Sequence, residues 1–205
     1  ANICKHSRQL LGIESAGWGG KVCLPKSASC EELTVPFVCD SAGELFGLQC
    51  AGWGGLNCLP KTAICSQIKN AYICNSAKSK LNMTCAGWGG RECLRRGASA
   101  SLITDMTVCQ NSKAWLGIVS AGWGGSSCLP PRSSANLITD PTICDNSKAW
   151  LGIDSAGWGG GKCLTRDAGC HEIASRFSCD NSLAKLGIAC AGWGGSSCLD
   201  QEAPA

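Results

Sequence analysis

Cysteine is the residue type with the widest chemistry in this sequence. The 205 residues include 18 cysteines but only two histidines, His6 and His171. Cysteine thiols form disulfides, ligate metal ions or act as nucleophiles. No two cysteines have the Cys-x-x-Cys spacing of zinc and redox sites, and the two histidines lie in different sequence contexts. We therefore expect a disulfide scaffold made in an oxidising compartment, without a metal ion or a cofactor.

Tryptophan is the second residue type with recognisable chemistry, and its position repeats. The pentapeptide Ala-Gly-Trp-Gly-Gly occurs six times, always 35 residues apart, starting at Ala16, Ala51, Ala86, Ala121, Ala156 and Ala191. A constant period over the whole length indicates a tandem array. We predict a single array over residues 1–205, with repeats at 1–35, 36–70, 71–105, 106–140, 141–175 and 176–205, the last one truncated. The residues of each repeat are numbered below as places 1 to 35.

Two places hold cysteine in every repeat. Place 4 is Cys4, Cys39, Cys74, Cys109, Cys144 and Cys179, and place 23 is Cys23, Cys58, Cys93, Cys128, Cys163 and Cys198. The simplest pairing joins place 4 to place 23 within each repeat, because pairing place 23 with the next place 4 would leave Cys4 and Cys198 without partners. Each bond would close a loop of about 20 residues and stabilise the fold by roughly 3 kcal/mol.

The remaining six cysteines occur in a matched pattern. Where place 30 is cysteine, place 15 of the next repeat is cysteine too, which predicts the bonds Cys30–Cys50, Cys65–Cys85 and Cys170–Cys190. Where place 30 is alanine, as in Ala100 and Ala135, the next place 15 is serine, as in Ser120 and Ser155. Cysteines that are present or absent together at these two places indicate that the places are in contact. We therefore expect these three bonds between repeats, no free thiol and no catalytic cysteine.

The two junctions without this cysteine pair carry another large residue. Trp115 and Trp150, both at place 10, occur only in repeats 4 and 5, whose place 15 is serine. One interpretation is that these rings replace the missing disulfide by burying apolar area across the junction. The other is recent duplication of one repeat, since the residues at 102–105 reappear at 137–140. Both interpretations stay open.

The local pattern predicts two short helices in each repeat. Place 12 is glycine in five repeats and Asn82 in the third, which is typical of a helix that ends in the left-handed conformation, and capping residues precede it. We therefore predict a helix over places 6–11 and a second helix from a capping residue at place 27 to about place 34. Asn82-Met83-Thr84 is also a glycosylation sequon, although the conformational interpretation is favoured. The expected core consists of places 3, 11, 13, 24 and 33 with the disulfides.

These patterns indicate a disulfide-rich tandem-repeat solenoid in which each repeat has about two short helices and a glycine-rich tryptophan loop. The alternative is a short-strand or mixed repeat with strands at places 1–3 and 13–15, because six-residue segments are hard to assign. We expect an open array rather than a closed ring, because a ring would bond place 30 of the last repeat to place 15 of the first, which are Ala205 and Ser15.

Composition bears on the possible functions. Charged residues make up only 16% of the chain, the net charge is +3, and lysine and arginine are scattered, so no nucleic acid is expected as a partner. No apolar run approaches the roughly 18 residues of a membrane span, and Ala1 does not open a signal peptide, so we expect a mature, soluble, secreted protein. No Ser/His/Asp set and no carboxylate pair recurs at fixed places, so no enzyme is expected.

The repeated tryptophan has two possible roles. Three neighbouring glycines would allow close backbone approach if the ring packs under a neighbour, and would also leave an exposed ring free to stack on a sugar. The first functional hypothesis is therefore a secreted, non-enzymatic scaffold that binds polysaccharide, a glycan or another extracellular surface multivalently. Its candidate ligand-binding residues are Trp18, Trp53, Trp88, Trp123, Trp158 and Trp193.

The second hypothesis is an extracellular structural protein that assembles head to tail into filaments. Ala205 and Ser15 repeat the alanine–serine combination of the internal junctions without cysteine, so the last repeat of one molecule could receive the first repeat of another. Ice binding is a third and weaker hypothesis, because threonines are few and hold no constant place.

Overall fold

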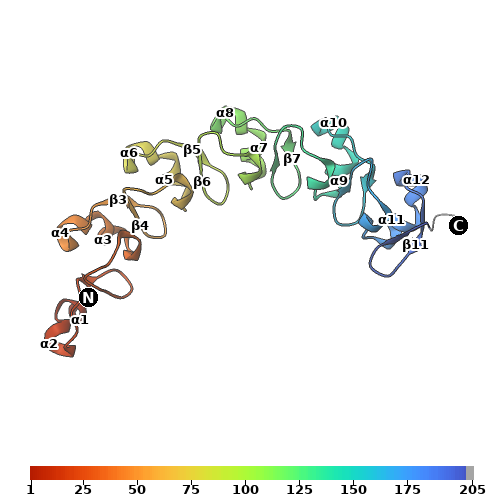
Figure 1. Ribbon diagram of the computed structural model, residues 1–205. Coiled ribbons are helices and arrows are strands. Elements are labelled where there is room, and N and C mark those ends of the chain that lie inside the picture. Colours follow the sequence, from red (N-terminus) through yellow and green to blue (C-terminus); the bar gives the residue numbers. More distant parts are fainter. Residues whose placement is uncertain (202–205) are drawn as a thin grey trace. The chain divides into compact units, whose positions relative to one another are not determined.

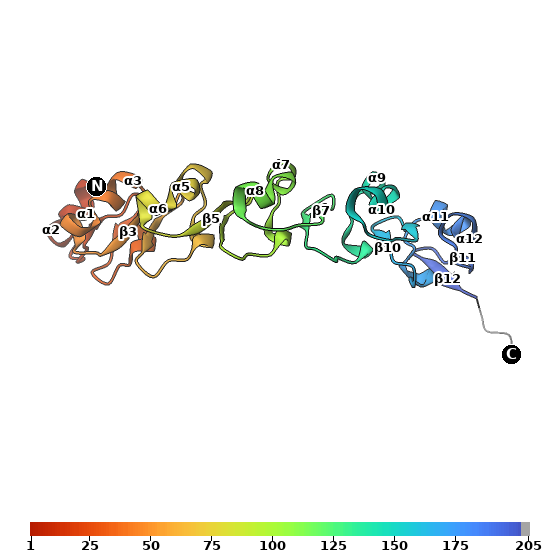
Figure 2. The same ribbon diagram turned by 90° about the horizontal axis from the view of Figure 1, so that it is seen from above.

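The computed structural model describes residues 1–201, and its contacts divide the chain into two compact units, one over residues 1–98 and one that begins at Ser99. Both units are built from the same repeat, and each of the six repeats folds into two short helices and a two-stranded sheet (Figure 1). In the second unit, α7 to α10 lie on one side of the chain path and the hairpins on the other (Figure 2). The predicted repeat is therefore confirmed as the structural unit.

A first helix covers the first five places of the repeat. These helices are α1 (Asn2–Lys5), α3 (Pro36–Asp40), α5 (Ala71–Asn75), α7 (Met106–Gln110), α9 (Pro141–Asp145) and α11 (Arg176–Asp180). In repeats 3 to 6 the cap is a side chain at place 35 of the preceding repeat. The Asp140 carboxylate, for example, accepts the Ile143 N–H at 3.0 Å, and Pro141 suits the first helical position. The alternative of strands at places 1–3 is therefore wrong, because the helix signal lies across the repeat boundary.

A second helix begins two residues later and ends at the expected place. These helices are α2 (Ser7–Leu11), α4 (Ala42–Phe46), α6 (Ala77–Leu81), α8 (Ser112–Leu116), α10 (Ser147–Leu151) and α12 (Ser182–Leu186). The next residue is left-handed in every repeat, with φ of 67° at Gly152 and 54° at Asn82. The predicted helix over places 6–11 is confirmed to within one residue, and Asn82 has the conformational role expected of it.

A β-hairpin follows, and the Ala-Gly-Trp-Gly-Gly motif forms its first strand and the start of its loop. The strand pairs are β1 (Gly17–Trp18) with β2 (Cys23–Leu24), β3 (Cys50–Trp53) with β4 (Cys58–Pro60), β5 (Cys85–Trp88) with β6 (Cys93–Arg95), β7 (Gly122–Trp123) with β8 (Cys128–Leu129), β9 (Gly157–Trp158) with β10 (Cys163–Leu164), and β11 (Cys190–Trp193) with β12 (Cys198–Asp200). All pairs are antiparallel, and place 18 lies opposite place 23, as Trp158 does opposite Cys163. The motif is therefore part strand rather than all loop.

The second predicted helix is wrong in extent. Places 30–32 form only a 3₁₀ turn in η1 (Cys30–Glu32), η2 (Cys65–Gln67), η3 (Ala100–Leu102), η4 (Ala135–Leu137) and η5 (Cys170–Glu172). The chain is extended again at place 33, where the carbonyl accepts the place-23 N–H of the next repeat, as in Ile138 O to Cys163 N at 3.0 Å. The backbone leaves the helical conformation at place 33, and the carbonyl there bonds the next repeat, so the helix predicted to continue to place 34 does not form.

The hydrophobic core lies at the junctions between repeats. Leu164 and Ile173 of repeat 5 pack with Cys179, Leu186 and Cys198 of repeat 6. Places 24 and 33 are fully buried in repeats 1 to 5, as predicted. Places 3, 11 and 13 are buried or half-buried in the later repeats, but they are exposed in repeat 1. One repeat thus supplies half a core and its neighbour supplies the other half.

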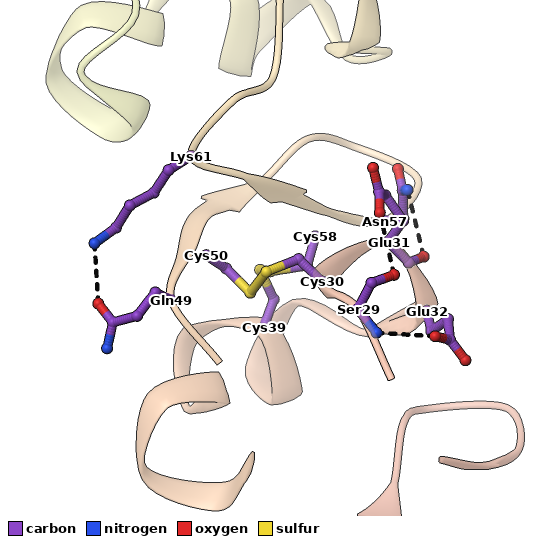
Figure 3. Close-up of a disulfide and its surroundings, with 10 residues drawn as sticks. All are labelled: Ser29, Cys30, Glu31, Glu32, Cys39, Gln49, Cys50, Asn57, Cys58 and Lys61. Carbon is purple, nitrogen blue, oxygen red and sulfur yellow. Dashed lines mark hydrogen bonds between the residues drawn. A yellow bond between two sulfur atoms is a disulfide. The ribbon is translucent and has the colours of Figure 1, made fainter. Parts of the chain in front are cut away.

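Nine disulfides hold these elements, and they use all 18 cysteines. Six join place 4 to place 23 within a repeat, and three join neighbouring repeats as Cys30–Cys50, Cys65–Cys85 and Cys170–Cys190. These are the pairs that the repeat pattern predicts. In Figure 3 the bonds Cys30–Cys50 and Cys39–Cys58 lie together between the helix pair and the hairpin.

The junctions without a disulfide are filled differently from expectation. Trp115 and Trp150 are 57% and 58% exposed, so the interpretation that they replace the disulfide by burial is wrong. The buried residue is Ile153 at place 13, which packs in the same core as Ala135, the alanine that replaces cysteine. Ser155, at place 15, instead hydrogen-bonds the buried Ser147 hydroxyl at 3.0 Å. An aliphatic side chain and a serine pair thus take the place of the bond.

This comparison predicts that a disulfide can be added. The triple variant Ala135→Cys, Ser147→Ala, Ser155→Cys reproduces the residues of the disulfide-bonded junctions. At those junctions the Cα atoms of the two bonded cysteines are 5.7 to 5.8 Å apart. We expect a tenth bond, no free thiol on titration, and a rise in unfolding free energy of roughly 3 kcal/mol, because the bond closes a loop of about 20 residues. Two reactive thiols in the folded variant would contradict the proposed equivalence of the junctions, and Ala135→Cys alone is the control with one thiol.

Candidate functional site

The six repeated tryptophans, the candidates from the sequence, are neither buried nor fully exposed. Trp18, Trp53, Trp88, Trp123, Trp158 and Trp193 are all half-buried. Trp53, Trp158 and Trp193 pack against the cores at the junctions with their preceding repeats. Each of these rings therefore gives part of its surface to the core, and the remainder is accessible. The packing role is shown, and the recognition role remains a prediction.

The first glycine of the motif allows the next repeat to approach. At Gly157 φ is +129°, and a Cβ there would lie 2.8 Å from Leu186 Cδ2, at place 11 of the following repeat. Gly52 and Gly122 are placed in the same way against Leu81 and Leu151. A side chain here would be strained by its backbone and would collide with the neighbour.

The other two glycines have separate roles. A Cβ at Gly159 would lie 2.7 Å from Leu164 of the same hairpin, so this glycine makes room for the buried place-24 leucine. At Gly125, where φ is +111°, a Cβ would lie 2.9 Å from Asp140, which caps the next helix. The glycines named here are thus required by packing, whereas Gly192 and Gly195 of repeat 6 have a positive φ but nothing within 4 Å of an added Cβ.

The accessible part of one repeated ring lines a groove. The groove has a volume of about 360 Å³ and lies at the junction of repeats 5 and 6. Its apolar walls include Pro141, Trp158 and Phe177, and Asp145 and Lys185 are its charged groups. Aromatic and apolar walls with a few polar groups are typical of sites for small ligands and sugar units.

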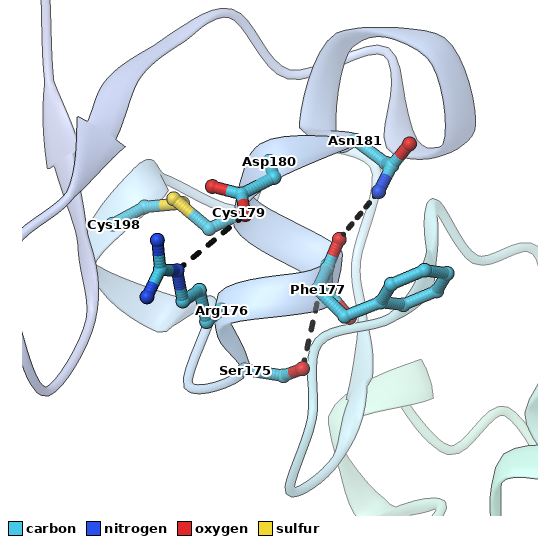
Figure 4. Close-up of polar contacts among 8 residues, drawn as sticks. Ser175, Arg176, Phe177, Cys179, Asp180, Asn181 and Cys198 are labelled. Atoms are coloured by element: carbon cyan, nitrogen blue, oxygen red, sulfur yellow. Dashed lines mark hydrogen bonds and ion pairs between the residues drawn. A yellow bond between two sulfur atoms is a disulfide. The ribbon is translucent and has the colours of Figure 1, made fainter.

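The side chains of α11 and α12 shape the far wall of this groove. The Ser175 hydroxyl accepts the Ser178 N–H at the helix start, and the Asn181 side chain donates to the Phe177 carbonyl at 2.8 Å. The Phe177 ring points away from the Cys179–Cys198 bond (Figure 4), and the Lys185 ammonium lies 4.5 Å from its centroid. Phe177 is therefore held at its backbone while its ring stays accessible.

Sequence reasoning missed Phe177 and Lys185 as candidate site residues. Place 2 is aromatic in repeats 2, 3 and 6, as Phe37, Tyr72 and Phe177, and in all three the side chain is more than half exposed. The expected core includes place 3 but not place 2, and a single sequence does not distinguish an exposed ring at place 2 from a buried one. The sequence does contain one signal: tryptophan occurs at place 10 only in the repeats that have threonine at place 2.

Two ion pairs lie in repeats 5 and 6 beside the residues that line the groove. The Lys148 ammonium donates to the Asp154 carboxylate at 2.9 Å, and this hydrogen bond lowers the pKa of Asp154. Arg176 and Asp180 form a second pair at 3.6 Å (Figure 4). Over residues 1–201, no group of three or more histidine, cysteine, aspartate or glutamate side chains could hold a metal ion. The helices in the same range are too short for any of them to cross a membrane.

The contacts of the glycines predict a sharp difference between two neighbouring positions. Gly157→Ala places a methyl group against Leu186 in an unfavourable backbone conformation, so we expect a loss of about 3 kcal/mol in unfolding free energy. Gly161→Ala is the matched control, because a Cβ there meets nothing within 4 Å, and a change within about 0.5 kcal/mol is expected. Denaturant unfolding of the oxidised proteins measures both, and equal stabilities would show that the approach of repeat 6 to Gly157 is not tight.

No protein-family model matches the chain, and neither does any curated protein or solved structure. The functional assignment therefore depends on the residues and contacts of the chain itself.

Proposed function

We propose that the chain is an extracellular, non-enzymatic scaffold that binds polysaccharide at several of its repeats. The observation that carries this proposal is the groove in which half-buried Trp158 and exposed Phe177 line one space of about 360 Å³. Flat aromatic faces stack on the apolar faces of pyranose rings, and nearby polar side chains bond the hydroxyl groups. Asp145 and Lys185, two side chains of opposite charge, supply such groups in this groove.

The disulfides support both the location and the mode of binding. Nine disulfides in a chain of this length are typical of the secretory route and of extracellular domains. They also keep each helix pair attached to its hairpin. Rigidly held sites that recur along one chain raise the effective concentration of each site for a polymer that is already bound at another. Weak single sites are then sufficient for firm retention.

Retention on insoluble polysaccharides tests this function. We expect the native oxidised chain to be depleted from solution by at least one of cellulose, chitin, xylan and mannan, with saturation and with a change in tryptophan emission on binding. Ile64→Ala, which truncates a similarly exposed side chain away from the groove, should bind as the native chain does. A native chain that none of these polymers retains would contradict the proposed function.

A second candidate function is end-to-end assembly, which requires that the repeats stack as an open solenoid. The place-24 leucine is at most 2% exposed in repeats 1 to 5, yet Leu199 of repeat 6 is 55% exposed. At the other end, Ile3, Leu11 and Ile13 are also exposed, although their equivalents in the last three repeats are buried or half-buried. Two uncovered halves of a junction core could cover one another in adjacent molecules. Ala205, the other residue in this hypothesis, lies outside the described residues.

Assembly would show a dependence on Leu199. We expect the native chain to form oligomers that grow with concentration in sedimentation velocity, and Leu199→Lys to stay monomeric because a charge would enter the junction. Leu56→Lys, at a similarly exposed leucine in a hairpin loop, should assemble normally. A monomeric mass for the native chain at all concentrations would rule out this candidate.

A further inference from the structure

Five of the six repeats expose one aromatic ring on their helix pair. Repeats 2, 3 and 6 carry it at place 2, and repeats 4 and 5 carry it at place 10. The residues are Phe37, Tyr72, Trp115, Trp150 and Phe177. All five side chains are between 57% and 75% exposed. Single exposed apolar residues need no explanation, but one in each of five successive repeats does.

Places 2 and 10 lie side by side although they belong to different helices. The Lys185 ammonium at place 10 is 4.5 Å from the ring centroid of Phe177 at place 2, and Lys80 is 5.0 Å from that of Tyr72. A ring at either place therefore covers the same part of the repeat. We call the surface at places 2 and 10 the ring patch.

The exposed ring is at place 2 in some repeats and at place 10 in others. Repeats 3 and 6 combine an aromatic ring at place 2 with lysine at place 10, whereas repeats 4 and 5 combine Thr107 or Thr142 with tryptophan at place 10. Repeat 2 has Phe37 with Leu45, and repeat 1, with Asn2 and Leu10, has no ring. A ring that served the core would be fixed at one place by its contacts. What these repeats share is an exposed ring in the patch, whichever helix supplies it.

The ring patch of one repeat adjoins the half-buried tryptophan of the preceding repeat. The Lys185 carbonyl, at place 10, would lie 3.9 Å from a Cβ at Gly157, the residue before Trp158. In repeats 2 and 3, the Lys80 carbonyl would lie 3.6 Å from a Cβ at Gly52, the residue before Trp53. Together with the groove that Trp158 and Phe177 line, these contacts describe a site with two rings, one fixed by packing and one free to change.

Charges around the ring patches do not favour an ionic ligand. Lys148 is paired with Asp154 beside the Trp150 helix, and Arg176 is paired with Asp180 beside Phe177. Asp145 and Lys185 contribute opposite charges to the groove. Repeat 2 carries Asp40 and Glu44 on its helix pair, and repeat 3 carries Lys78 and Lys80. With no constant sign of charge, the shared element is the ring itself, with polar groups beside it.

We propose that the ring patches are the specificity-determining part of the polysaccharide site, and that the ligand is a neutral polysaccharide whose pyranose rings stack on them. This inference rests on the proposed function. Trp158 forms the constant wall at the junction of repeats 5 and 6, and we expect its equivalents to do the same at the other junctions. The ring at place 2 or place 10 provides the exposed stacking face, and its exchange between helices preserves that face while its polar neighbours change.

Moving a ring between the two places tests the proposal directly. Phe177→Thr removes the ring of repeat 6, and the double variant Phe177→Thr, Lys185→Trp restores a ring in the arrangement of repeats 4 and 5. On a neutral polysaccharide that retains the native chain, we expect about a fivefold loss of affinity for the single variant and recovery in the double variant. Because both positions are on the surface, all three proteins should unfold alike, and Leu183→Thr, exposed on the same helix pair, is the matched control.

The outcomes separate the two levels of the argument. If no polysaccharide retains the native chain, the proposed function fails, and the inference fails with it. If the native chain is retained but Phe177→Thr binds equally well, or the double variant does not recover, the proposed function stands and the ring patch is overturned. Retention only on carboxylated or sulfated polymers, lost at about 0.5 M salt, would overturn the neutral ligand. The proposal is supported if a neutral polymer retains the native chain at every salt concentration, if Phe177→Thr loses affinity, and if the double variant recovers it.

Discussion

The structure depends on packing between neighbouring repeats, because no repeat contains a complete core. The place-33 carbonyl of one repeat accepts the place-23 N–H of the next, as in Leu33 to Cys58 at 2.9 Å. That bond brings the buried leucine of one hairpin against the first helix of the following repeat. Its constant geometry requires a repeat of constant length, which explains why the chain has no insertion or deletion over its six units.

Sequence reasoning succeeded where the pattern of a residue type along the repeats specifies its role, and it failed where a helix cap or a backbone bond comes from a neighbouring repeat without such a pattern. Cysteines that appear and disappear together specify contact, and glycine or Asn82 at place 12 specifies a left-handed helix end. The first helix was missed because its cap, such as Asp140, belongs to the preceding repeat. The second helix was predicted too long because the chain becomes extended at place 33, where it bonds the next repeat, and the local sequence does not show that contact.

The candidate site was predicted in part for the same reason. Trp158 does line the groove, but the three glycines around it are accounted for by contacts with Leu186, Leu164 and Ser175. Constancy along the array therefore reports packing first, and it does not identify a ligand. The exposed rings vary in type and in place, so a search for invariant residues overlooks them. The better candidate for a recognition surface in this array is the exposed aromatic ring, which five repeats keep although its place in the repeat changes.

The difference between the two kinds of junction has a mechanical consequence. Where Cys170 is bonded to Cys190, the disulfide carries part of a pulling force applied to the backbone. That junction can therefore extend only a little before the covalent bond resists. Where Ala135 and Ser155 stand instead, the same force acts only on the apolar contacts of Ile153 and on backbone hydrogen bonds. Under load we therefore expect extension to begin at the two junctions without a disulfide, while the three bonded junctions stay closed.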